Sequence, residues 1–164
     1  MPEALLTGLS QVGVAIAGFS GIAVVLVARD DAVWVRTKAF TIKALMETSL
    51  TVAVFALLPL TLEYIVVDVN MGLAALTTMF GIWMAWILWL ALRRGQFIWS
   101  KLSVGPVVVG AVFVTLVLIT VGAANISEYL WPAYLLGLFW LLVMAALNFS
   151  LLLYSRLDTE IEEE

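Results

Sequence analysis

The stretch PVVVGAVFVTLVLITVGAA, residues 106–124, contains no charged side chain. A membrane-spanning helix needs about 20 mostly apolar residues, because each residue adds about 1.5 Å and the hydrocarbon layer is about 30 Å thick. The stretch has that length and composition. The whole chain is similarly apolar, since 64% of its 164 residues are hydrophobic and 12% are charged, whereas soluble domains have about 25% charged residues. The sequence therefore predicts a membrane protein.

Four further apolar stretches on either side of this one meet the same criterion. We predict an all-α, polytopic membrane helical bundle with five transmembrane helices, at about residues 5–28, 40–67, 71–92, 106–124 and 129–154. Pro106 and Pro132 suit the first turn of their helices, and Ser127 is a candidate N-cap. We expect residues 1–157 to form a single transmembrane domain, and residues 158–164 to form a short acidic tail in the cytoplasm.

The basic residues indicate an orientation. If the loops alternate between the two sides of the membrane, all eight lysine and arginine residues fall on one side. The positive-inside rule then places the N-terminus outside and the C-terminus in the cytoplasm. The outer side would carry four acidic residues, Glu3, Glu63, Asp68 and Glu128. Solvated surface charge is the simpler interpretation, but several copies around a pore mouth would also raise the local cation concentration.

The chain has no cysteine and no histidine. This excludes disulfides and removes the usual ligands of haem, zinc and copper, together with the usual general base near neutral pH. No two carboxylates fall on one face of one helix. We therefore predict no enzymatic activity, no metal and no cofactor. The basic residues form no extended patch, so nucleic acid is not an expected partner; the lipid bilayer is.

One carboxylate lies inside a predicted span, in KALMETSL, residues 43–50. A charge within the bilayer costs roughly 2.5–3.5 kcal/mol on insertion scales, so Glu47 needs a partner or a water-filled cavity. Lys43 lies four residues earlier on the same helix face and is the simplest charge partner. If Lys43 instead extends alone to the interface, Glu47 needs protonation or a hydrated cavity. Thr51 lies one turn further along the same face and would extend a polar track.

The first predicted helix has a stripe of small residues, Ser10, Gly13, Ala17 and Gly21, at spacings of three and four. Such a stripe allows another helix to approach closely, and helix packing is our first interpretation. The alternative is that hydroxyl, amide and carbonyl groups line a wet path. Its side chains would be those of Ser10, Gln11 and Ser20.

Two further features concern helix shape and depth. Pro59 lacks an N–H and should kink the second helix, with a static kink as the default interpretation and a gating hinge as the alternative. In the third helix, Trp89 and the nearby Trp99 are expected anchors at the membrane interface. Trp83 and Trp86 lie deeper and are expected to fill grooves between helices or subunits.

Three parts of the first 60 residues resemble a known pattern. They are Ala17-Gly18-Phe19-Ser20-Gly21-Ile22, then Trp34 with Arg36, and then Phe55-Ala56-Leu57-Leu58-Pro59. Together they look like small, uncharacterised bacterial polytopic membrane proteins. The resemblance implies an integral protein of the bacterial inner membrane and implies no activity.

Two functions are consistent with these features. The first is a homo-oligomeric, cation-preferring channel, because five helices alone hardly enclose a hydrated path and a ring of copies would. Its pathway would be lined by Ser10, Gln11, Ser20, Glu47 and Thr51. The alternative is a non-conducting accessory or assembly subunit of a larger inner-membrane complex, in which these polar groups pair with another membrane protein.

Overall fold

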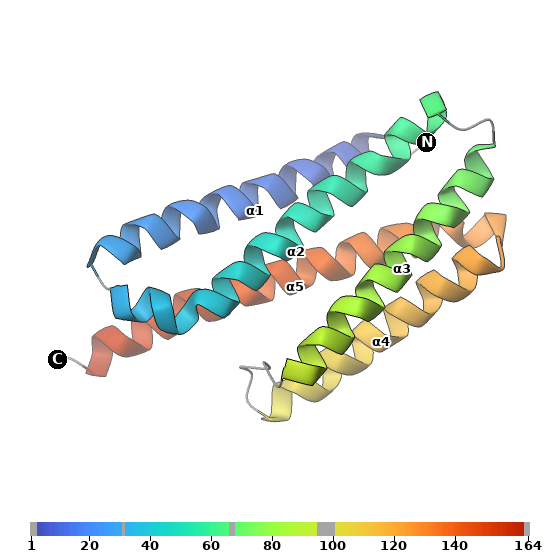
Figure 1. The fold of residues 1–164 in the computed structure, drawn as a ribbon. Helices are drawn as coiled ribbons and strands as arrows, with labels where there is room; N and C mark the ends of the chain where they lie inside the picture. Colours follow the sequence, from blue (N-terminus) through green and yellow to red (C-terminus); the bar gives the residue numbers. More distant parts are fainter. Residues whose placement is uncertain (1–2, 31, 66–67, 95–100, 163–164) are drawn as a thin grey trace. The chain divides into compact units, whose positions relative to one another are not determined.

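The structure is a computed structural model that describes residues 3–30, 32–65, 68–94 and 101–162. Side chains are described for a smaller set, which excludes those of residues 26–41 and 151–162. The described residues are all-α and contain no strand (Figure 1). Their five helices are α1 (Glu3–Asp30), α2 (Ala32–Ile65), α3 (Val69–Arg94), α4 (Lys101–Ala123) and α5 (Ser127–Glu162).

Four of these helices are long and apolar enough to cross a membrane. The apolar segments are Ile42–Leu62 in α2, Val69–Leu90 in α3, Gly105–Ala123 in α4 and Ser127–Ser150 in α5. In α1 the apolar segment within the described residues is Glu3–Phe19, which is shorter. Four helices of this kind are typical of an integral membrane protein. The crossing by α1, and with it the count of five spans, stays a prediction.

Several helices begin or end outside their predicted bounds. Helix α2 begins at Ala32 rather than near residue 40, and α5 continues to Glu162, so that most of the acidic tail is helical. Helix α4 begins at Lys101, which places Pro106 inside the helix rather than in its first turn, and Pro132 is likewise inside α5. The start of α2 near residue 40 and the first-turn positions of Pro106 and Pro132 were wrong because hydropathy locates the segment that fits the hydrocarbon layer and does not locate the helix end.

Acidic residues occupy the N-terminal ends of three helices. Asp68 caps α3, because its Oδ1 accepts hydrogen bonds from the backbone N–H groups of Asn70 at 3.0 Å and Met71 at 3.3 Å. Glu3 and Glu128 lie in the first turns of α1 and α5. Carboxylates are favoured there because the helix dipole is positive at its N-terminus. These three acids therefore have a local structural role; the fourth, Glu63, has its side chain outside the described part.

Asn125 ends α4 in a left-handed conformation, with φ of 49°. Its N–H donates to the carbonyl of Gly122 at 3.1 Å, and the N–H of Ile126 donates to the carbonyl of Val121 at 3.3 Å. This pair of bonds is a Schellman motif, and asparagine is one of the few residues besides glycine that tolerate its geometry. Because α5 begins at Ser127, the motif makes a tight connection between α4 and α5.

The contacts divide the chain into two compact units. The first unit comprises Met1–Leu57 and Leu141–Glu164, and the second comprises Leu58–Trp140. In the first unit, α1, α2 and the later part of α5 share a cluster in which Ile42, Leu45 and Ala145 are buried. Ile16 of α1 and Phe149 of α5 pack against that cluster.

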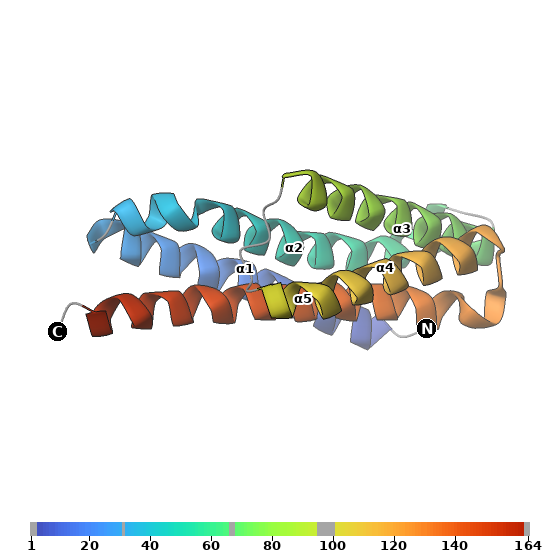
Figure 2. The same cartoon turned by 90° about the horizontal axis from the view of Figure 1, so that it is seen from below.

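In the second unit, α3 and α4 lie side by side and antiparallel (Figures 1 and 2). Glycines allow the close approach: a Cβ atom on Gly81 would lie 2.7 Å from Ile119 Cγ1, and one on Gly122 would lie 2.7 Å from the Thr78 backbone nitrogen. The earlier part of α5 joins them through aromatic packing. A Cβ on Gly137 would lie 2.6 Å from Phe80 Cε1.

Candidate functional site

The backbones of α1 and α2 meet in the first unit at one short stretch. Ser10 is buried, and its hydroxyl donates a hydrogen bond to the carbonyl of Ala53 at 3.3 Å. One turn along α1, a Cβ atom on Gly13 would lie 2.8 Å from the carbonyl oxygen of Ser49 and 3.2 Å from the nitrogen of Ala53. The small side chains at these positions therefore let α2 approach α1 at backbone distance.

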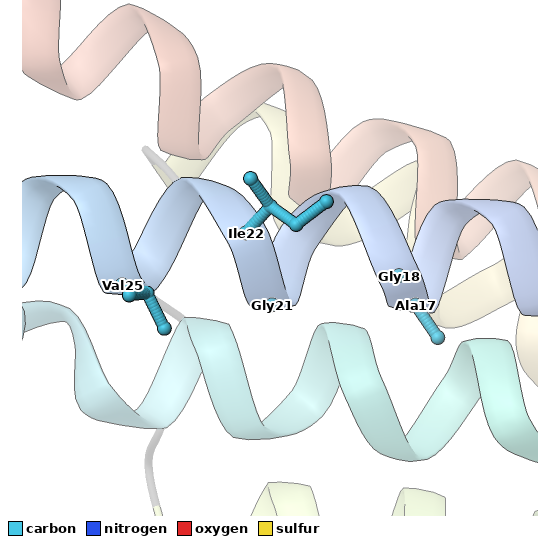
Figure 3. Close-up of a pocket in the computed structure, with 5 residues that line it drawn as sticks. All are labelled: Ala17, Gly18, Gly21, Ile22 and Val25. Atoms are coloured by element: carbon cyan, nitrogen blue, oxygen red, sulfur yellow. The ribbon is translucent and has the colours of Figure 1, made fainter.

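The second half of the small-residue stripe has a different environment. A Cβ atom on Gly21 would have no atom within 4 Å. Ala17, Gly18, Gly21, Ile22 and Val25 instead line an apolar groove of about 380 Å³ (Figure 3). Ala17 and Val25 point to one side of α1 and Ile22 to the other. The predicted packing stripe therefore divides into a part occupied by α2 around Gly13 and an open part around Gly21.

Lys43 and Glu47 lie near the start of the apolar segment Ile42–Leu62. Lys43 Nζ is 3.6 Å from Glu47 Oε1, and the two side chains are 67% and 59% exposed. An exposed pair of this i,i+4 kind contributes only about 0.3–0.5 kcal/mol in water. The pair is therefore local to α2 and is exposed at the surface of the first unit.

The rotation of α2 explains this exposure. The residues of α2 closest to Gly13 are Ser49, Val52 and Ala53. Glu47 precedes Ser49 by two residues, so at about 100° per residue it lies roughly 160° away around the helix axis. Thr51 is half-buried, and its hydroxyl donates to the carbonyl of Glu47 at 2.7 Å. We call the exposed side of α2 that carries Lys43, Glu47, Leu50, Val54 and Leu57 its outward face.

Of the five residues predicted to line a pathway, Ser10, Gln11 and Glu47 do not face one common lumen in the described chain. Ser10 is engaged with α2, Gln11 is exposed on α1, and Glu47 belongs to the outward face of α2. The side chain of Ser20 lies outside the described part. Pro59 is fully buried within α2, which continues on both sides of it, and the kink at this position stays a prediction.

A cation and two indole rings form a cluster on α3 that the sequence analysis missed. The guanidinium carbon of Arg93 lies 4.3 Å from the centroid of the Trp89 ring, and the rings of Trp86 and Trp89 are 5.2 Å apart. Trp86 is 59% exposed, so it fills no groove between helices of the described chain, and the alternative of a groove between subunits stays a prediction. The spacing of four between Trp89 and Arg93 was the available signal, because such residues share a helix face.

No group of three potential acidic metal ligands occurs among the residues that the structure describes. The described hydroxyls include one that is buried without a hydrogen-bond partner, Thr115 Oγ1. Comparison with protein-family models, with curated proteins and with solved structures finds no match for the chain. The resemblance to small bacterial membrane proteins therefore stays a prediction.

Proposed function

We propose that this protein is a non-conducting accessory or assembly subunit of the bacterial inner membrane, and that it binds another membrane protein through the outward face of α2. The supporting observation is the exposed Lys43–Glu47 pair at the start of an apolar segment. Charged groups are costly at membrane depth unless they are paired or hydrated. A polar surface on a partner helix would offset that cost for both side chains.

The distribution of polar groups along α2 favours association over conduction. Lys43, Glu47 and Thr51 lie in the first half of the apolar segment, whereas Val54 and Leu57 continue the outward face as exposed apolar side chains. The next exposed hydroxyl, that of Thr61, comes only near the end of the segment. A polar patch of about two turns suits pairing with a neighbouring helix, where interhelical hydrogen bonds contribute about 0.6–2 kcal/mol each. A continuous ion path would need polar groups or a wide lumen along most of the span.

A homo-oligomeric, cation-preferring channel is the second candidate, because Glu47 and Thr51 are neighbours along the outward face. In a ring of copies with this face at the symmetry axis, Glu47 would form a ring of carboxylates near one end. Val54 and Leu57 would form an apolar constriction of the kind that gates by dewetting. Ser10 would not line such a path, because its hydroxyl is engaged with Ala53.

For both candidates we propose the orientation given by the basic residues, with the N-terminus outside and the C-terminus in the cytoplasm. In that arrangement Lys43 lies at the cytoplasmic end of the apolar segment of α2. Its long side chain then extends toward the headgroups while remaining in reach of Glu47.

Crosslinking of the outward face tests the association. The chain has no cysteine, so Leu50→Cys and Val54→Cys each introduce a single reactive thiol. We expect both variants to crosslink in native membranes to one defined partner chain, and the additional replacements Lys43→Leu and Glu47→Leu to reduce the yield severalfold. Met79→Cys, exposed on α3, is the matched control and should not give that product. Failure of both α2 positions to crosslink would contradict the association.

Conductance separates the two candidates. We expect purified protein in planar bilayers to give no current under conditions in which a control channel conducts. A reproducible cation current whose selectivity changes in Glu47→Gln would favour the channel and exclude the non-conducting subunit. Glu128→Gln is the matched control, because Glu128 is an exposed carboxylate in the first turn of α5.

A further inference from the structure

The guanidinium of Arg93 is held on an aromatic platform at the end of α3. It lies 4.3 Å from the Trp89 ring centroid, well within the range of about 6 Å for a cation–π interaction. The guanidinium is planar, and its N–H donors form a fork that matches a phosphate. No carboxylate among the described residues is paired with Arg93. The group is therefore an oriented cation without an anionic partner in the described chain.

The cluster lies at the end of the apolar segment of α3, at the depth of the lipid headgroups. The segment of α3 that fits the hydrocarbon layer ends at Leu90. Trp86 and Trp89 lie in its last turns, and Arg93 lies about 4.5 Å beyond Leu90 at about 1.5 Å per residue. Tryptophan prefers this depth, and a cation at this depth faces lipid phosphates.

The platform continues into the membrane as one exposed stripe. Met79, Ile82, Trp86, Trp89 and Arg93 follow each other at spacings of three and four, and all five are exposed. Residues at these spacings share a helix face. From Leu90 to Met79 the stripe is about 16 Å long, which is close to the roughly 15 Å hydrocarbon thickness of one leaflet. An acyl chain in that leaflet would therefore have an apolar surface along its whole length.

We propose that this stripe is a binding site for one anionic phospholipid. The phosphate accepts hydrogen bonds from the guanidinium edge of Arg93, which matches phosphate in a bidentate geometry. The glycerol region contacts Trp89, and one acyl chain runs along Trp86, Ile82 and Met79. Charge complementarity selects the headgroup, and the length of the apolar stripe selects a molecule with acyl chains over a free phosphate. The site lies on α3 and is independent of the association through α2.

Native mass spectrometry of the intact chain in detergent tests this proposal. Titration with phosphatidylglycerol should give a saturable single-lipid adduct, and phosphatidylcholine should bind more weakly. Arg93→Gln should lower retention of phosphatidylglycerol about fivefold, since one basic residue near an anionic surface contributes about 1 kcal/mol. Retention of phosphatidylglycerol by Arg93→Lys should lie between that of the unmodified protein and that of Arg93→Gln. Lysine keeps the positive charge but lacks the paired N–H donors of the guanidinium. Trp89→Leu should weaken the binding of both lipids.

Two controls distinguish a specific lipid-binding site from nonspecific electrostatic attraction. Lys43→Gln removes the same charge from α2 and should leave retention of phosphatidylglycerol unchanged, and inorganic phosphate at millimolar concentration should not displace the lipid. Equal losses in Arg93→Gln and Lys43→Gln would overturn the proposal in favour of diffuse electrostatics. Displacement by inorganic phosphate, or equal binding of the two lipids, would overturn it as well. Circular dichroism of each variant verifies that the helices are intact.

Discussion

At Gly13 in the first unit an added Cβ atom would meet the backbone of α2, whereas at Gly81 and Gly137 in the second unit it would meet the side chains of Ile119 and Phe80. In the first unit, glycine therefore allows two backbones to touch, and the hydrogen bond from Ser10 accompanies that contact. In the second unit, Gly81 and Gly137 make space for a large side chain from a neighbouring helix, while Gly122, like Gly13, lets two backbones come close. Lipid is as apolar as leucine, so close packing and hydrogen bonds, rather than hydrophobic burial, hold both units together.

The largest effect should come from removing a side chain that fills such a space. Phe80 is fully buried, and its ring centroid is 5.6 Å from that of Tyr134. We expect Phe80→Ala to lower the free energy of unfolding by about 3 kcal/mol, the lower end of the range for Phe→Ala in soluble cores. The lower end applies because the transfer term is small when the surroundings are lipid, while the cavity term remains. Unfolding in increasing SDS, followed by circular dichroism, measures the change.

Phe113→Ala is the control for this prediction, because Phe113 is an exposed phenylalanine on α4 of the same unit. It should change the free energy of unfolding by less than about 1 kcal/mol, since its ring fills no space between helices. If Phe80→Ala and Phe113→Ala lowered the free energy of unfolding by similar amounts, the packing of Phe80 inside the second unit would not be a source of its stability.

A smaller effect should separate the two halves of the small-residue stripe. Gly13→Ala forces the backbones of α1 and α2 apart, and overpacking of this kind costs about 1–3 kcal/mol. The Cβ added in Gly21→Ala would lie in open space. This variant should instead raise the free energy of unfolding by up to about 1 kcal/mol, because alanine favours the helix more than glycine does. The gain in helix propensity is common to both variants, so the difference between their unfolding free energies isolates the contact. Equal stabilities would contradict the close approach at Gly13.

The stripe also shows what the sequence predicts and what it leaves open. Spacings of three and four indicate that a backbone can approach along Ser10, Gly13, Ala17 and Gly21. They do not indicate where the partner helix comes close, because the path of α2 depends on its other contacts. The same reasoning applies to helix ends: the apolar segments of α2 to α5 were predictable from composition, while the start of α2 at Ala32 was not, because that part of the helix lies outside the apolar segment.

The direction of Glu47 was unpredictable for a related reason. Apolar residues occur on all sides of α2, so no hydrophobic periodicity distinguishes the face toward α1 from the face toward lipid or a partner. Among the described residues, the contacts of Ser49, Val52 and Ala53 with α1 place Glu47 on the outward face. By contrast, the cap at Asp68 was available to sequence reasoning, because an aspartate directly before an apolar helix is a typical N-cap.

The smallest effect concerns the hydrogen bond between the two helices of the first unit. Ser10→Ala removes the donor to the carbonyl of Ala53, and interhelical bonds inside membrane proteins average about 0.6 kcal/mol. We expect Ser10→Ala to lower the free energy of unfolding in SDS by that amount. Gln11→Ala should cause no loss, because Gln11 is exposed one position further along α1. A change in membrane permeability in Ser10→Ala at unchanged stability would contradict the packing role, because a serine that only joins two helices contributes to their association and not to a path for ions.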